Sequence, residues 1–150
     1  MSNPLSRRLQ KEISQMRSSP TPGISMTEDQ DNMNRWIVEM DGAPGTLYAG
    51  EKFKLQFIFG DNYPFSSPQV VFIGPNIPVH PHVYSNGHIC LSILGEDWTP
   101  ALGVHSVCLS ILSMLSSCKE KKEPPDNAVY VLRSSKNPKH TSWWYHDEDV

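Results

Sequence analysis

Four side chains that can act as nucleophiles, bases or metal ligands lie within eleven residues of this chain: His80, His82, His88 and Cys90. Cys90 follows Asn86-Gly87, a dipeptide typical of tight turns, so we expect it to lie in a loop. Cys108 falls on the apolar face of a predicted helix, where it is interpreted as a small buried side chain. Cys118 follows that helix and is predicted to be an incidental surface thiol. Cys90 is therefore the candidate nucleophile.

Two other chemistries fit the same residues. The three histidines and Cys90 could bind a zinc ion if the loop folded back on itself, although zinc sites usually separate their ligand pairs by a longer stretch. Cys90 could instead belong to a hydrolase in which a histidine activates the thiol. The sequence assigns no third group that would orient such a histidine. Spacing alone leaves both alternatives open.

Regular elements precede this segment. Leu5, Leu9, Ile13 and Met16 form one apolar stripe of a predicted helix. Asn3-Pro4 is typical of a helix start, and the stretch 18–23 is expected to end the helix. Strands are predicted at 24–27, 34–40, 52–59 and 69–73, and the third of them shows the clearest alternation of apolar and polar residues. Short connections between successive strands favour an antiparallel meander.

The stretch from Gly74 to Gly103 has little periodicity and several prolines. An irregular segment of this length within a compact domain is usually functional or disordered, and its apolar content favours function. A second helix is predicted over about 104–117, with an apolar face formed by Val104, Cys108, Ile111, Leu112 and Leu115. No repeat or long linker divides the chain, so we expect one domain over 1–150, with a core of about 5–118 and a divergent tail of about 119–150.

Composition excludes several classes of protein. The chain has 150 residues, 38% hydrophobic and 19% charged, which suits a soluble domain with one core. Its net charge of −3 argues against a nucleic-acid partner, and no apolar run approaches the roughly 20 residues that a membrane span needs. Three cysteines, an odd number, argue against a disulfide framework. We therefore expect the cytoplasm, the nucleus or both.

The active-site segment resembles that of the ubiquitin-conjugating enzymes. The resemblance covers roughly residues 5–118 and rests on five motifs: the run from Arg8 to Glu12, Tyr63-Pro64-Phe65 with Pro68, His80-Pro81-His82, the run from Asn86 to Leu91, and Trp98-Thr99-Pro100-Ala101. Tail motifs at 124–127 and 143–147, with His82 in place of the family's usual asparagine, resemble one branch, the W branch. The resemblance implies an α+β fold with an N-terminal helix, a four-stranded antiparallel meander, a long active-site loop, a central helix and a short irregular or helical tail.

The resemblance also implies roles. Cys90 matches the cysteine that accepts ubiquitin from the activating enzyme as a thioester and passes it to a substrate amine, with a RING or U-box ligase. No cofactor is bound, because ATP is used upstream by the activating enzyme. Ligase contacts are implied at Arg8, Phe65, Thr99, Pro100 and Ala101, and ubiquitin contacts at Ser106, Leu109 and Ser113.

His82 would brace the loop or donate to an oxyanion. Trp143 and Trp144 could hold substrate or pack the tail onto the domain. A ubiquitin-binding module without transfer activity is an alternative, but such relatives lack the cysteine.

Two positions depart from the pattern of lysine-directed members. Ser92 replaces an aspartate, and in a loose alignment Lys122 stands at another usually acidic position. At cytosolic pH roughly a quarter of α-amines but only about 0.1% of lysine amines are neutral and able to attack, so lysine depends more on a carboxylate that takes its proton. His82 or His88 could take it instead. The W branch is known for modifying protein N-termini. We therefore hypothesise that flexible N-termini receive a single ubiquitin, with a lysine-directed enzyme as the alternative.

Overall fold

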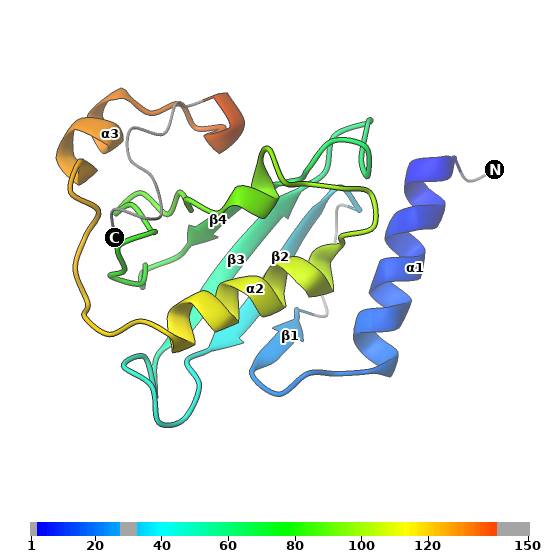
Figure 1. Ribbon diagram of the computed structural model, residues 1–150. Helices are drawn as coiled ribbons and strands as arrows, with labels where there is room; N and C mark the ends of the chain where they lie inside the picture. The colour runs from blue at the N-terminus through cyan, green and yellow to red at the C-terminus, as the bar shows by residue number, and fades with distance from the viewer. Residues whose placement is uncertain (1–2, 28–32, 141–150) are drawn as a thin grey trace.

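The computed structural model describes residues 3–27 and 33–140. Along the chain, the elements are α1 (Pro4–Ser18), β1 (Ile24–Met26), β2 (Arg35–Asp41), β3 (Lys52–Ile58), β4 (Gln69–Ile73), η1 (Ser92–Leu94), α2 (Val104–Ser116), α3 (Asn127–Arg133) and η2 (Pro138–His140) (Figure 1). In the part of the chain described here, no helix combines the length and apolarity needed to span a bilayer.

The first helix begins where the sequence predicted. The side chain of Asn3 accepts a hydrogen bond from the backbone N of Ser6 at 2.8 Å, and Pro4 occupies the first turn, so a free N–H at the helix start is satisfied. α1 ends at Ser18, before the proline-rich stretch. Its buried face holds Leu9 and one charged residue, Glu12.

The four strands form a sheet in the order β1-β2-β3-β4, with every neighbouring pair antiparallel, which confirms the predicted meander. Alternate residues of β2 and β3 face the core: Trp36, Val38, Met40, Phe53, Leu55 and Phe57 are all buried. β3 ends one residue before the predicted boundary, but Phe59 remains 3% exposed and its backbone N donates to the Asn34 carbonyl at 2.9 Å. The alternation in the sequence therefore reflects which side chains are buried, and this alternation continues one residue beyond the end of the β3 hydrogen-bond ladder.

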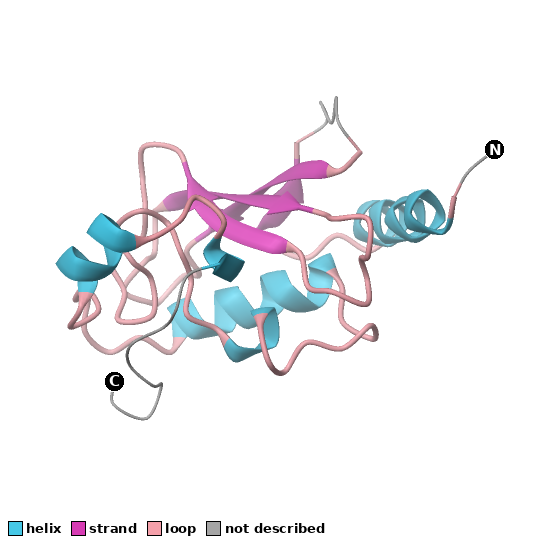
Figure 2. Cartoon of the chain, turned by 90° about the horizontal axis from the view of Figure 1, so that it is seen from above, coloured by secondary structure: helices cyan, strands magenta, loops and turns pink. Residues whose placement is uncertain are grey.

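α2 packs against the inner face of the sheet and makes a two-layer structure (Figure 2). The predicted apolar face is confirmed for Val104, Cys108, Ile111 and Leu115, which are buried. Leu112 is only half-buried, and Val107 is buried in addition to the predicted set. A hydrogen bond of 2.8 Å between Thr21 Oγ1 and His105 Nε2 links the connection after α1 to the first turn of α2.

The tail contains the short helix α3 and the single turn η2, which agrees with the prediction of an irregular or helical tail. α3 lies at the opposite end of the molecule from α1 (Figure 1). The Lys139 side chain in η2 donates to the backbone carbonyl of Ser67 at 2.8 Å, next to the start of β4. Trp143 and Trp144 lie outside the described residues.

Candidate functional site

Cys90 lies in an irregular segment that folds back along β4. The backbone N of Phe72 in β4 donates to the carbonyl of Gly87 at 2.9 Å, and Gly87 has a φ of +93°. A side chain at position 87 would overlap the carbonyl of Phe72, so glycine is required there both by conformation and by space. The Asn86-Gly87 turn predicted from the sequence thus fixes the chain three residues before Cys90.

The backbone around Cys90 is held by its own loop. The N–H of Cys90 donates to the His82 carbonyl at 2.8 Å, and Val83 and Ile89 form an isolated antiparallel bridge. The cysteine is 8% exposed. A nucleophile held on a constrained loop at this depth can carry an acyl group in a defined direction.

His82 lies beside the cysteine, as the sequence predicted. Its Nδ1 is 3.3 Å from the carbonyl oxygen of Cys90. A carbonyl can only accept, so this contact places a ring hydrogen on Nδ1. His82 also lines a hollow of about 430 Å³ whose other walls come from Met114 in α2 and from the segment that follows it.

His80 braces the same loop against α2. Its Nδ1 accepts from the backbone N of His82 at 2.9 Å, and its Nε2 lies 3.1 Å from the Met114 carbonyl. Burial, reinforced by the neighbouring His82, lowers the pKa of His80 to about 4. The ring is therefore neutral at physiological pH and fastens the loop to the helix.

The structure corrects the expectation that His88 takes part in the chemistry. The ring is 4% exposed, its Nδ1 lies 2.8 Å from the hydroxyl of Tyr130, and it also forms a hydrogen bond with the backbone of Lys136. Burial lowers its pKa. His88 therefore binds the tail to the active-site segment and does not face an incoming amine.

These contacts also argue against the zinc alternative. His80 is engaged with Met114 and His88 with Tyr130, so the two rings turn to different neighbours. Among the described residues, no group of three or more histidine, cysteine or acidic side chains is arranged to hold a metal ion.

Sequence reasoning missed the way in which α3 attaches to the site. The rings of Tyr84 and Tyr130 stack with centroids 3.6 Å apart, and the Tyr84 hydroxyl donates to both carboxylate oxygens of Asp126 at 3.0 and 3.1 Å. The backbone N of Ser85 donates to Asn127 Oδ1 at 2.9 Å. The Asp126-Asn127 motif was visible in the sequence, but its partners lie some forty residues earlier and no local pattern connects them.

Ser92 begins η1, where its carbonyl accepts from the backbone N of Gly95 at 2.9 Å and of Asp97 at 3.0 Å. No carboxylate stands at position 92 itself. Lys122, the other departure from the pattern, does line the hollow beside His82, and so does Glu120. No sequence pattern had distinguished Glu120 from the charged residues around it.

The remaining cysteines differ in their environments. Cys108 is fully buried in α2, as predicted, and burial raises the pKa of its thiol to about 12. Cys118 is not the plain surface thiol that was expected. It is half-buried, its sulfur accepts from the Tyr48 hydroxyl at 3.4 Å, and its thiol donates to the Glu120 carbonyl at 3.3 Å.

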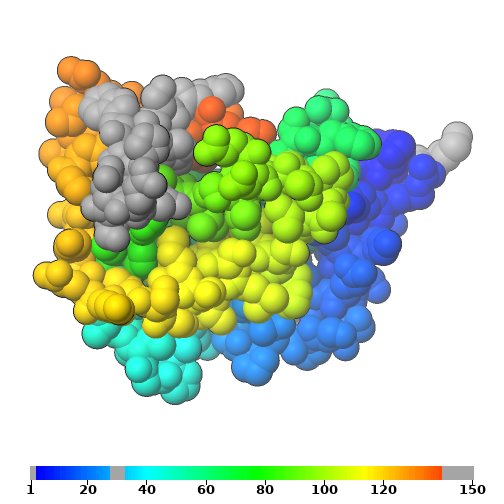
Figure 3. Space-filling view, in the orientation of Figure 1, coloured from blue at the N-terminus to red at the C-terminus, as the bar shows by residue number. Residues whose placement is uncertain are grey.

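The predicted ligase-contact residues gather at one end of the molecule. Phe65 is 74% exposed, and Thr99, Pro100 and Ala101 are also exposed. Figure 3 shows the loop after β3, the segment before α2 and the start of α1 side by side on this face. Arg8 is partly exposed, and its guanidinium donates to the carbonyls of Pro100 and Leu102 at 3.0 and 2.8 Å.

The predicted ubiquitin-contact residues lie along one side of α2. Leu109 is 41% exposed, which is unusual for a leucine in this helix. Ser106 is half-buried and Ser113 is exposed. Positions three and four apart share a helix face, so the three side chains can meet one partner.

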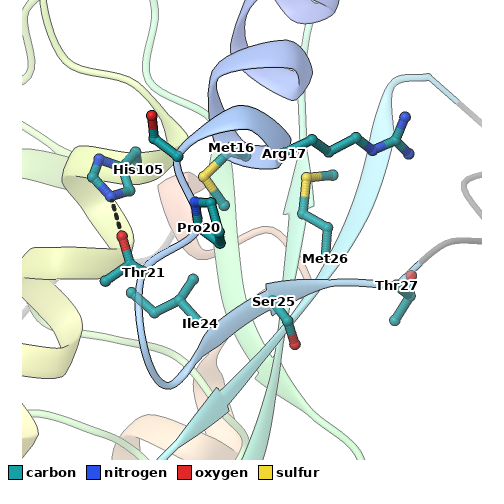
Figure 4. Close-up of a pocket in the computed structure, with 10 residues that line it drawn as sticks. Met16, Arg17, Pro20, Thr21, Ile24, Ser25, Met26, Thr27 and His105 are labelled. Carbon is teal, nitrogen blue, oxygen red and sulfur yellow. Dashed lines mark hydrogen bonds between the residues drawn. The ribbon is translucent and has the colours of Figure 1, made fainter.

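A further hollow, of about 290 Å³, lies between the end of α1 and β1 (Figure 4). Met16, Pro20, Ile24 and Met26 supply most of its apolar lining, and Thr21 and His105 close one side through their hydrogen bond. It is distant in the sequence from Cys90 and takes no part in the site described above.

Comparison with known proteins agrees with this arrangement. The family model described as ubiquitin-conjugating enzyme matches residues 8–146. A Danio rerio protein named probable ubiquitin-conjugating enzyme E2 W-A is 61% identical over 146 residues, which are 96% of this chain and 97% of that protein. A Caenorhabditis elegans protein named ubiquitin-conjugating enzyme E2 W is 59% identical over 152 residues and covers the whole of both chains. The crystal structure of ubiquitin conjugating enzyme E2 UbcA1 from Agrocybe aegerita has a TM-score of 0.88 and 44% identity, covering 92% of this chain and all of that one.

Proposed function

Because this chain belongs to the ubiquitin-conjugating enzyme family and its full-length relatives carry the name E2 W, we propose that it transfers ubiquitin from Cys90 to the N-terminal α-amino group of substrate proteins. Enzymes of the family are transferases that form a thioester and work with ubiquitin, an activating enzyme and ligases. The assignment of Cys90 and the choice of amine are the parts proposed here.

The assignment of the thioester to Cys90 is supported by the contrast among the cysteines. Cys108 is fully buried and has a raised pKa, so it is a poor nucleophile. Cys118 lies after α2, outside the segment that carries Cys90, and its sulfur accepts a hydrogen bond from the Tyr48 hydroxyl. Cys90 lies on the loop that His80 and His82 brace.

The choice of amine is carried by one observation, Ser92 in place of a carboxylate. The neutral amine attacks the thioester carbonyl, the tetrahedral intermediate expels the Cys90 thiolate, and an amide bond replaces the thioester. The amine must lose a proton during this step. Without a carboxylate at position 92, the site is best matched to an amine with a substantial neutral fraction, which is roughly a quarter for an α-amine and only about 0.1% for lysine.

We assign the proton to Nε2 of His82. Its Nδ1–H is used by the Cys90 carbonyl, and the ring lines the hollow beside the loop that carries Cys90. An imidazole nitrogen can accept a proton in general-base catalysis. His82 would thus both brace the loop and receive the proton.

The proposal extends to partners and location. RING or U-box ligases would contact Phe65, Thr99, Pro100 and Ala101, and the thioester-linked ubiquitin would lie on α2 at Ser106, Leu109 and Ser113. ATP would be consumed upstream by the activating enzyme, with no cofactor bound to this chain. The cytoplasm and nucleus are the proposed locations.

The experiment is a single-turnover discharge of charged enzyme at pH 7.2. One acceptor is a short peptide whose only amine is its N-terminus, and the matched control is an N-acetylated peptide of the same length with a single lysine. We expect the first to be at least about tenfold faster, a conservative figure given the difference in neutral fraction. Equal or faster discharge to the lysine peptide would support the lysine-directed alternative.

A further inference from the structure

One buried carboxylate joins three parts of the molecule. Glu12 in α1 is 6% exposed. Its Oε2 accepts from Arg8 Nε at 2.9 Å and from the hydroxyl of Tyr63 in the loop after β3, and its Oε1 accepts from the backbone N of Val104 at 2.7 Å. A buried charge is tolerated when it is paired and hydrogen-bonded in this way.

The bond to Val104 replaces a missing helix cap. The residue before α2 is Gly103, which has no side chain that could accept from the first N–H groups of the helix. A carboxylate at this position satisfies one of those groups and interacts favourably with the helix dipole. A Cβ at position 103 would overlap Oε1 of Glu12, so the two positions are matched to each other.

The same carboxylate reaches both loops of the exposed end described above. Tyr63 lies two residues before Phe65, and burial together with its bond to Glu12 raises its pKa, so that it stays a hydrogen-bond donor. On the other side, Arg8 is held by Glu12 through Nε and by the carbonyls of Pro100 and Leu102 through Nη2. The two loops also bond directly, since Trp98 Nε1 donates to the Pro64 carbonyl at 2.8 Å.

We propose that Glu12 is a positioning residue for ligase-dependent transfer: its carboxylate fixes the loop that carries Phe65 relative to the segment that carries Pro100 and Ala101. This inference rests on the proposed ligase surface. Glu12 is buried and does not contact the ligase. It acts by holding the surface in one arrangement before binding, which reduces the ordering that binding must supply.

Two substitutions disturb this arrangement in different ways. Glu12→Gln keeps the size of the side chain but has a single acceptor oxygen and an NH₂ group, so at least one of the three donors loses its partner. Gly103→Ala keeps the charge and every donor but pushes on Oε1. Agreement between the two would identify the carboxylate's position as the cause, and Gly103→Ala still reports on it if Glu12→Gln fails to fold.

The test measures the Kd for a purified RING domain that stimulates the wild-type chain, and the ratio of stimulated to unstimulated thioester discharge. We expect both variants to weaken RING binding about tenfold and to lower the ratio by a similar factor, as loss of a well-ordered interface does. Val38→Ala is the control. It leaves a cavity in the buried centre of β2 and should lower stability without changing a contact of the two loops. It should keep the wild-type ratio at a temperature where circular dichroism shows all variants folded.

Phe65→Ala separates this inference from the proposed function. If Phe65→Ala loses RING binding while Glu12→Gln and Gly103→Ala keep the wild-type Kd, the ligase surface stands and the role of Glu12 is overturned. If Val38→Ala lowers the ratio as much as Glu12→Gln, the effect is general instability and the role of Glu12 is again overturned. Retained binding in Phe65→Ala would overturn both, because the loops that Glu12 joins would then not be the docking surface.

Discussion

The hydroxyl of Tyr130 lies 2.8 Å from Nδ1 of His88, two positions before Cys90. This bond joins α3 to the segment that carries the cysteine, and the stacking of Tyr130 on Tyr84 reinforces it. The tail after α2 is therefore part of the structure that holds the active-site loop.

Tyr130→Phe tests how much this link contributes. The ring stack with Tyr84 is kept, but Nδ1 of the buried His88 loses its partner. An unsatisfied buried group costs about 1–3 kcal/mol, so we expect the free energy of unfolding in urea to fall by about that amount. Leu132→Ala, at an α3 position that is 84% exposed, should change it by less than about 0.5 kcal/mol. Equal effects of the two substitutions would show that the bond adds nothing.

Stability should fall as the pH drops below neutral. Burial lowers the pKa of His80 from 6.5 to about 4, so the unfolded chain binds a proton at a pH where the folded chain does not. The free energy of unfolding therefore decreases as the pH falls through 6.5 toward 4. His80 alone should account for about 2 kcal/mol between pH 7 and pH 5, and the lowered pKa of His88 acts in the same direction.

The measurement is urea unfolding at pH 7 and pH 5, for wild type and for His80→Gln. The variant has no imidazole at position 80, so its loss of stability over this interval should be smaller by about 2 kcal/mol. Parallel profiles for the two proteins would contradict the assignment of His80 as a neutral, buried brace.

Ser92→Asp should broaden the choice of amine. A carboxylate at the start of η1 could accept the proton that lysine must lose, and general-base assistance is typically worth about 10²–10⁴-fold. We expect the rate of discharge to the N-acetylated lysine peptide to rise at least about fivefold, well below the full effect of a positioned base. The rate with the α-amine peptide should change less. Ser14→Asp, an exposed position in α1, controls for added charge. A lysine rate that stays at the wild-type level would remove position 92 as the cause of the preference.

His82→Asn separates the two roles assigned to this residue. Asparagine, the family's usual residue, can still donate to the Cys90 carbonyl but cannot accept the amine proton. Discharge to the α-amine peptide should slow by at least about tenfold at pH 7.2. This is a conservative figure, because general-base catalysis typically contributes about 10²–10⁴-fold. Both proteins should discharge faster at higher pH, because more of the amine is neutral. An unchanged rate at pH 7.2 would mean that His82 only braces the loop.

Patterns local in the sequence were sufficient for most of the fold. The alternation of Phe53, Leu55 and Phe57 identified a half-buried strand because successive side chains point to opposite faces. The Asn86-Gly87 dipeptide identified the turn before Cys90 because glycine accepts a positive φ.

Features that depend on distant contacts were not predictable in this way. Nothing in the sequence indicated that Glu12 would be buried, since its partners Tyr63 and Val104 lie 51 and 92 positions away. For the same reason the bond between Arg8 and Leu102 was not predictable, and His88 was a candidate to face an amine, whereas its ring is bonded to Tyr130. Residue type indicated what these side chains can do, and only packing decides which partners they meet.

The central claim, preference for an α-amine, is tested most directly on one acceptor that offers both choices. Charged enzyme is discharged at pH 7.2 to a flexible peptide with a free N-terminus and a single lysine, and tandem mass spectrometry locates the ubiquitin on the product. At least about 90% of the product should carry it on the α-amine, given the far larger neutral fraction of that group. A majority of product modified on the lysine would contradict the account.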